Sequence, residues 1–254
     1  MKTLSEILIE IDSAKTELDK HRPLSPFQLK NIEDALFVEY TYESNRIEGN
    51  TFTLQETALV IQKGITIAGK AMREHLEAIN HFEAIGFIKM IAEKKEALRE
   101  RTLKDIHSII LRSIDSENAG RYRTVNVKIA GSTHIPVDAL KIQEKMDEYF
   151  RFYIEQKDLL HPVLLSANLH EKFVTIHPFI DGNGRTARLI MNLILMSHGY
   201  CIVNITGSNE SRLSYYNTLE KCQTENSCDD FHMLVANAEL HSINQYLNLI
   251  KSAN

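Results

Sequence analysis

The sequence contains no tryptophan, and aromatic residues make up only 7% of its 254 residues. Such a composition argues against a surface that stacks the bases of a nucleic acid. The net charge of −5, from 29 basic and 34 acidic residues, is not gathered into a basic stripe. We therefore expect no nucleic-acid partner.

Cysteine and long apolar runs are equally scarce. Cys201, Cys222 and Cys228 form an odd set without a CxxC pair, which excludes a disulfide scaffold or a zinc ribbon and fits a reducing compartment. The purest apolar stretch, residues 189–196, is interrupted by Asn192 and is far too short to span a membrane. The N-terminus lacks the apolar region of a signal peptide. We therefore expect a cytoplasmic protein without a membrane partner.

With only 10 glycines and 5 prolines, most of the chain reads at helical period. The segment 123–137 (RTVNVKIAGSTHIPV) is different, because Val125, Val127 and Ile129 alternate with polar residues. This alternation, followed by a plausible turn, predicts a β-hairpin. We expect an all-α protein whose helical core carries this one small hairpin.

A twelve-residue segment, 177–188, gathers residue types that phosphate chemistry requires. It reads HPFIDGNGRTAR and lies between two stretches of helical period. Gly182 and Gly184 allow backbone N–H groups to approach a phosphate, and the start of the following helix favours negative charge. Arg185 and Arg188 lie three residues apart, so they share a helix face and can clamp a polyphosphate.

Two further side chains complete the set. Asp181 offers the hard oxygen ligand that Mg²⁺ prefers, and His177 can act as a base near neutral pH. A base, a metal ligand, an amide nest and two arginines are the parts of phosphoryl-type transfer. A turn that merely opens a helix explains an isolated GNG, but not all twelve residues.

The same segment resembles the signature of the Fic-domain family, HxFx(D/E)GNGRxxR, at every fixed position. Residues 120–137 are similar to the flap hairpin of that family, and 212–222 (RLSYYNTLEKC) to its nucleotide-contacting helix. Residues 41–57 (TYESNRIEGNTFTLQET) resemble the inhibitory-helix region of the subgroup with N-terminal autoinhibition. The resemblance implies the Fic fold, with an N-terminal helical region over 1–90 and a Fic catalytic core over 91–254, packed as one compact unit.

The resemblance also implies transfer of AMP from ATP to a Tyr, Thr or Ser hydroxyl of a target protein. His177 would deprotonate that hydroxyl, and Asp181 would hold Mg²⁺ against the phosphates. The implied phosphate and nucleotide contacts are Gly182, Asn183, Gly184, Arg185, Arg188, Tyr215, Tyr216 and Gln223. The implied flap residues that line up the target are Ile129, Gly131, Ser132, Thr133 and His134. Gln223 departs from the family, because close relatives carry asparagine there.

Ser44, Glu48 and Gly49 match the inhibitory pattern (S/T)xxxE(G/N). A Glu48 carboxylate paired with Arg188 would occupy the guanidinium that the γ-phosphate needs, so the enzyme would be autoinhibited. In some relatives the same glutamate aligns a water that removes AMP from the target. A de-AMPylating phosphodiesterase, or a bifunctional enzyme, is therefore the alternative activity.

A non-catalytic role, as an antitoxin or a nucleotide-sensing scaffold, is disfavoured, because such a protein would not need His177, Asp181 and Arg188 together. The sequence identifies neither the target protein nor the modified residue. It leaves the oligomeric state open, including a homo-oligomer.

Overall fold

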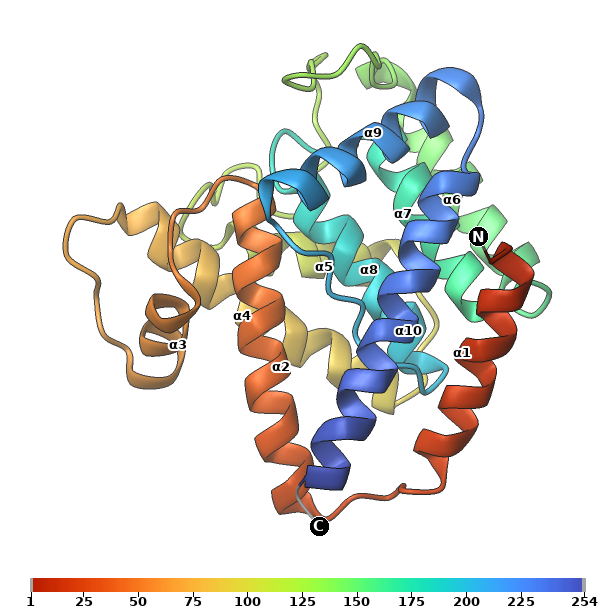
Figure 1. The fold of residues 1–254 in the computed structure, drawn as a ribbon. Coiled ribbons are helices and arrows are strands. Elements are labelled where there is room, and N and C mark those ends of the chain that lie inside the picture. The colour runs from red at the N-terminus through yellow and green to blue at the C-terminus, as the bar shows by residue number, and fades with distance from the viewer. Residues whose placement is uncertain (1, 253–254) are drawn as a thin grey trace.

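The computed structural model describes residues 2–252, without the side chains of residues 26–29, 31 and 252. This part of the chain forms ten α-helices and one short 3₁₀ helix (Figure 1). The elements are α1 (Leu4–Asp19), α2 (Pro26–Ile47), α3 (Leu54–Lys63), α4 (Met72–Glu93), α5 (Glu100–Leu111), η1 (Ala139–Lys141), α6 (Ile142–Gln156), α7 (Pro162–Ile176), α8 (Asn183–Ser197), α9 (Asn209–Glu225) and α10 (Asp229–Ser252). The predicted all-α class is confirmed. None of the described helices combines the length and apolarity that a membrane crossing needs.

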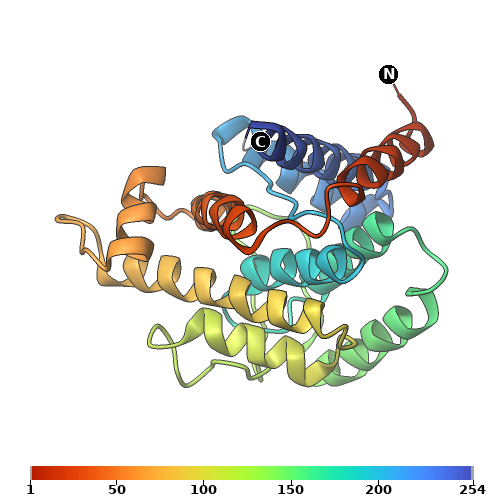
Figure 2. The same cartoon turned by 90° about the horizontal axis from the view of Figure 1, so that it is seen from below.

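Helix α8 lies at the centre of the fold. Its residues from Arg185 to Leu195 are all buried, as expected for a helix that is largely apolar. It packs against α7, α4 and α5 and also contacts α2. Figure 2 shows α8, in cyan, between α2 on one side and α4 on the other. The loop that leads into α8 is therefore attached to the most enclosed element of the protein.

The N-terminal helices enclose this centre. Helix α1 packs along α10, and α2 packs on α4. The main apolar core includes buried residues from Ile7 to Ile250, so it joins the two ends of the chain. The proposed division near residue 90 falls inside α4 and stays a prediction.

Helix α3 is attached differently. A separate small cluster of Phe52, Val60 and Ala78 packs it against α4. Its start is a capping box, in which the Thr53 hydroxyl accepts from the Glu56 N–H at 3.1 Å. The Glu56 carboxylate accepts from the Thr53 N–H at 2.7 Å in return.

The prediction of a β-hairpin over residues 123–137 is wrong, since no β-strand occurs within residues 2–252. Two arms do run out and back, but the guanidinium of Arg123 joins them by donating to the carbonyl oxygens of Val125 (2.8 Å) and Val137 (2.5 Å). The alternating apolar side chains do not pack on a core, because Val125 and Ile135 are exposed. An isolated two-stranded hairpin is only marginally stable, so side-chain bonds replace the ladder. We call residues 123–137 the flap.

Asn192, the residue that interrupts the apolar run, is buried in α8 and fixes the chain that follows. Its amide nitrogen donates to the carbonyl oxygen of Val203 at 3.1 Å. Its amide oxygen accepts from the Val203 N–H at 2.8 Å. The side chain thus supplies both bonds that a neighbouring strand would otherwise give to this extended segment.

We predict that Asn192→Leu lowers the free energy of unfolding by about 2–6 kcal/mol, because two buried main-chain groups lose their partners at about 1–3 kcal/mol each. Urea denaturation measures the change. The matched control is Asn237→Leu on the exposed face of α10, which should shift stability by less than about 0.5 kcal/mol. Equal losses in the two variants would contradict this account of Asn192.

Candidate active site

The loop between α7 and α8 is fixed by its own main chain and by one side chain. His177 ends α7 with a left-handed φ of +53°, and Gly182 precedes α8 with a φ of +74°. Asn183 then binds Phe179 twice, since its amide oxygen accepts from the Phe179 N–H (3.0 Å) and its amide nitrogen donates to the Phe179 carbonyl (2.9 Å). Both ends of this amide hold the loop, so a phosphate contact from the Asn183 side chain stays a prediction.

His107 of α5 supports the same loop. Its ring stacks on Phe179, with centroids 3.5 Å apart and planes 4° apart. Nδ1 accepts from the Gly120 N–H at 2.9 Å, so the proton lies on Nε2, which donates to the Asp181 carbonyl at 2.9 Å. No spacing signal could reveal this residue, because it lies 74 positions from Asp181.

The predicted base is neutral in this environment. Burial, together with Arg123 and His134 nearby, lowers the pKa of His177 to about 4, against the opposing effects of the Val174 carbonyl and Glu48. Nδ1 lies 3.4 Å from the Val174 carbonyl oxygen, which can only accept, so Nδ1 carries the proton. The lone pair of Nε2 is therefore the one that can take a proton from a substrate.

Arg188 is the central cation of the site. Its side chain is 1% exposed, and Nε donates to the Ser44 hydroxyl at 2.9 Å. Nη2 donates to the Ser44 carbonyl at 2.9 Å and to Glu48 Oε1 at 2.7 Å. Burial favours the neutral form of Arg188, but the Glu48 carboxylate, together with Tyr215 and Tyr40, raises the pKa of the guanidinium above its ordinary range.

The Glu48 carboxylate reaches the first turn of α8 as well as Arg188. A Cβ at position 184 would overlap with Glu48 Oε1, so Gly184 provides the space that the carboxylate fills. Gly49 follows in a left-handed conformation with a φ of +97°, directly after the end of α2. An acidic group thus already lies where a helix N-terminus and a buried arginine attract an anion.

Asp181 and Arg185 form a second polar group beside this one. Arg185 is 3% exposed, and its guanidinium lies 3.5 Å from Asp181 Oδ1 and 3.4 Å from Glu77 Oε1 of α4. Burial raises the pKa of Asp181, but Arg185, the Gly182 N–H and Arg73 of α4 together lower it below its ordinary value. The carboxylate is therefore ionised, as a cation ligand must be.

Asp181 can serve as a ligand for Mg²⁺ only when the phosphates of a nucleotide supply further oxygen ligands. Among the described residues no three His, Cys, Asp or Glu side chains gather as a metal cage. Mg²⁺ commonly binds one carboxylate plus substrate phosphates, and Asp181 beside the anion-binding start of α8 matches that arrangement.

The predicted nucleotide helix contributes in two ways. Tyr215 is buried, and its hydroxyl lies between Arg188 (3.4 Å) and His170 Nε2 (2.9 Å), so here it supports Arg188. Tyr216 is 39% exposed and donates to the Ile47 carbonyl at 3.0 Å, beside the inhibitory segment. Gln223 lies half-buried toward the end of α9. Direct nucleotide contacts by these three residues stay predictions.

The flap lies against the same site. His134 Nε2 binds the carbonyl oxygen of Thr175 at 2.9 Å, two residues before His177. The Thr133 N–H donates to Glu220 of α9 at 2.8 Å, and Arg123 Nε donates to the His177 carbonyl at 2.9 Å. Ser132 accepts from the His134 N–H, and its own N–H closes a turn on the Ile129 carbonyl around Gly131.

Comparisons with known proteins identify the family. Residues 97–195 match the model of the Fic/DOC family. Over 245 residues the chain is 33% identical to Protein adenylyltransferase Fic of Nematostella vectensis, with 95% of this chain and 56% of that one covered. It is 32% identical to Protein adenylyltransferase fic-1 of Caenorhabditis elegans, covering 89% of this chain and 44% of that one.

Solved structures agree with this assignment. A Fic domain containing signaling protein from Bacteroides thetaiotaomicron superposes with a TM-score of 0.87 at 28% identity, over 96% of this chain and 98% of the other. Fic-1 from C. elegans superposes with a TM-score of 0.86 at 28% identity, over 99% and 74%. The chain belongs to the Fic/DOC family and has the Fic fold. It spans about half the length of the curated relatives that it matches.

The buried histidines predict how acid destabilises the protein. Burial lowers the pKa of His107 to about 4, of His170 to about 3 and of His177 to about 4. In the unfolded chain histidine is protonated near pH 6.5. Between about pH 6.5 and 4 the unfolded state therefore binds more protons than the folded state, and stability decreases as the pH decreases.

We expect His107→Gln to reduce this loss by up to about 1.4 kcal/mol per pH unit, because one proton fewer is taken up on unfolding. Urea denaturation from pH 4.5 to 7.5 measures the slope. The exposed His241 provides the control, and His241→Gln should leave the slope as in the wild type. An unchanged slope in His107→Gln would contradict the prediction.

Proposed function

We propose that this protein is a protein adenylyltransferase, which transfers AMP from ATP to a hydroxyl side chain of a target protein and is autoinhibited by Glu48. One observation carries the proposal. A neutral His177 ends one helix, and the next helix begins with an anion site where Arg188 is held ready by Ser44 and Glu48. Relatives named protein adenylyltransferases support the same reaction.

The geometry suggests the proton and charge movements of the reaction. His177 Nε2 takes the proton from the target hydroxyl, whose oxygen attacks the α-phosphorus while pyrophosphate leaves. The main-chain N–H groups of Asn183 and Gly184 would face the phosphates at the start of α8, where the helix dipole stabilises negative charge. The Gly182 N–H donates to Asp181 in this structure and would have to exchange that partner to join them. Arg185 and Arg188 take the β- and γ-phosphates. Asp181 would hold Mg²⁺, which would supply positive charge to neutralise the phosphates.

Autoinhibition follows from competition for one guanidinium. Glu48 Oε1 lies 2.7 Å from Arg188 Nη2 and against Gly184, where the terminal phosphate would lie. Two anions cannot share this space, so ATP binds in an unproductive position or not at all. Removing the carboxylate frees both the cation and the start of α8.

We predict that Glu48→Gly labels itself or added proteins when incubated with α-labelled ATP and Mg²⁺, whereas the wild type labels weakly. Autoradiography after denaturing electrophoresis detects the label. Glu48→Gly/His177→Ala is the matched control, and it should lose the signal because no base remains. The proposal would be contradicted if neither the wild type nor any variant became labelled while all of them were folded and bound ATP.

Removal of AMP from a modified target is the second candidate activity. About a third of the Glu48 side chain is exposed, although Oε1 binds Arg188. The carboxylate therefore reaches the open edge of the site, where it can orient a water for attack on a phosphodiester.

For this activity we expect the wild type to release AMP from a modified protein and Glu48→Gly to lose at least about a hundredfold in rate, the lower end of the usual scale for loss of a general base. Chromatography of free AMP measures the release. Glu43→Gly, a glutamate of α2 that binds the Gly207 N–H instead of Arg188, is the control. Release that persists in Glu48→Gly would exclude Glu48 as the group that activates the water.

The setting and partner belong to the same proposal. Cys201, Cys222 and Cys228 are all free thiols, which agrees with a reducing cytoplasmic compartment. The flap, whose tip is bound to α7 and α9, offers exposed main chain to an extended target segment. Its residues 129–134 would align the target hydroxyl with His177.

A further inference from the structure

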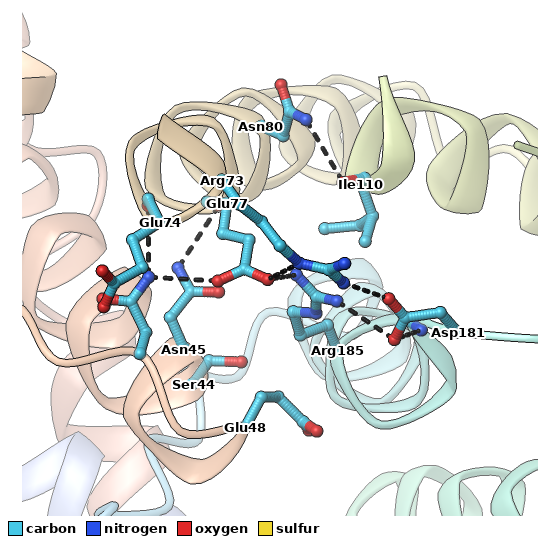
Figure 3. Close-up of polar contacts among 12 residues, drawn as sticks. Ser44, Asn45, Glu48, Arg73, Glu74, Glu77, Asn80, Ile110, Asp181 and Arg185 are labelled. Carbon is cyan, nitrogen blue, oxygen red and sulfur yellow. Dashed lines mark hydrogen bonds and ion pairs between the residues drawn. The ribbon is translucent and has the colours of Figure 1, made fainter. Parts of the chain in front are cut away.

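The carboxylate of Asp181 is already occupied by a cation from another part of the chain. Arg73, in the first turn of α4, places Nη2 2.5 Å from Asp181 Oδ2. Arg185 lies 3.5 Å from the other oxygen, and the Gly182 N–H donates to it at 2.6 Å. Figure 3 shows the two guanidinium groups converging on this carboxylate. The group that the proposed function assigns to Mg²⁺ is thus bound on both of its oxygens.

A half-buried glutamate, Glu77, holds Arg73 in this position. Glu77 lies one turn further along α4, and its side chain is only 12% exposed. Its Oε1 accepts from Arg73 Nε at 3.1 Å and lies 3.4 Å from Arg185 Nη1. Glu77 therefore positions both Arg185, which belongs to the proposed phosphate site, and Arg73, which does not.

The same turn of α4 binds the segment that carries Glu48. Glu74 accepts from the Thr51 N–H and hydroxyl, both at 2.7 Å. Asn50 donates to the Glu74 carbonyl at 3.1 Å and to the Glu77 carboxylate at 3.2 Å, and Asn45 donates to the Glu77 carbonyl at 3.3 Å. The inhibitory segment and Arg73 are thus parts of one hydrogen-bonded assembly.

Arg73 differs from the two arginines of the phosphate site in one respect. Its side chain is 56% exposed, whereas those of Arg185 and Arg188 are 3% and 1% exposed. Arg73 can turn into solvent without leaving a buried charge unpaired, so its contact with Asp181 can open at small cost. The other two arginines are enclosed and stay in place.

We propose that Arg73 is a second inhibitory contact, in which its guanidinium occupies the Asp181 carboxylate in place of the cation that ATP brings. This inference rests on the proposed function and deepens it. In the resting protein Glu48 covers the phosphate cation, and Arg73 covers the metal ligand. Because α4 binds both the Glu48 segment and Arg73, displacement of that segment loosens the two contacts together.

The test measures binding without transfer, using α,β-methylene-ATP in a Glu48→Gly background. Calorimetry gives the dissociation constant of the analogue with Mg²⁺ and with EDTA. The value in EDTA divided by the value in Mg²⁺ reports how much the cation contributes to binding. We expect Arg73→Gln to increase this ratio about three- to tenfold, the scale of one partly exposed ion pair. Arg73→Lys, which keeps the charge but not the forked geometry, should give an intermediate ratio.

Two controls separate the outcomes. Arg101→Gln removes a 91% exposed arginine of α5 that pairs only with Asp105 among the described ion pairs, and it should leave the ratio unchanged. In an Asp181→Asn background, Arg73→Gln should have no effect on the ratio. Thermal melting confirms that each variant is folded.

An unchanged ratio in Arg73→Gln overturns the inference, while label transfer by Glu48→Gly can still support the proposed function. Weaker binding of the analogue by the same factor with and without Mg²⁺ also overturns it, because Arg73 would then be a phosphate ligand. Failure of every folded variant to bind the analogue would refute the proposed function itself, and this inference with it.

Discussion

A single positive charge removed from water organises the active-site end of this protein. The guanidinium of Arg188 is buried in the most enclosed helix, and such a charge is tolerated only where every donor finds an acceptor. Ser44 supplies a hydroxyl and a carbonyl, Tyr215 a hydroxyl and Glu48 the compensating carboxylate. These partners come from α2 and α9, so the need to satisfy one side chain draws distant parts of the chain together. The ion pair between Glu48 and Arg188 therefore also satisfies a buried charge.

The same chemistry underlies the proposal that inhibition by Glu48 and productive nucleotide binding exclude each other. A terminal phosphate offers Arg188 what Glu48 offers, namely a negatively charged oxygen at hydrogen-bond distance. The buried charge is neutralised in either state, and only the identity of the anion changes. Asp181 is the opposite case. Its negative charge is paired with Arg73 in this structure and would be paired with a metal ion when a nucleotide is bound.

Much of this arrangement could be predicted from the sequence, because its signals are local. The order of residues 177–188 specifies a base, a carboxylate and two arginines around a helix start, and the helix boundaries follow from apolar period and from caps such as Thr53. The pairing of Glu48 with Arg188 was expected from the family resemblance and agrees with the geometry. The flap was predicted as a hairpin because Val125, Val127 and Ile129 alternate with polar residues, the spacing of a strand. The structure joins its arms through the guanidinium of Arg123 instead.

What the sequence could not give is contact between residues far apart with no shared pattern. His107, Arg73 and Glu77 occupy ordinary helical positions, and only packing shows that they bind the loop before α8.

The way in which α3 is attached has a further consequence. Its apolar contacts form a cluster of their own, apart from the core that holds α8. Local opening requires least free energy where few buried contacts must break, so the part of the chain around Phe52 can open while the reacting groups keep their positions. A binding partner that held this small unit would act on the neighbouring Glu48 segment from outside the candidate active site.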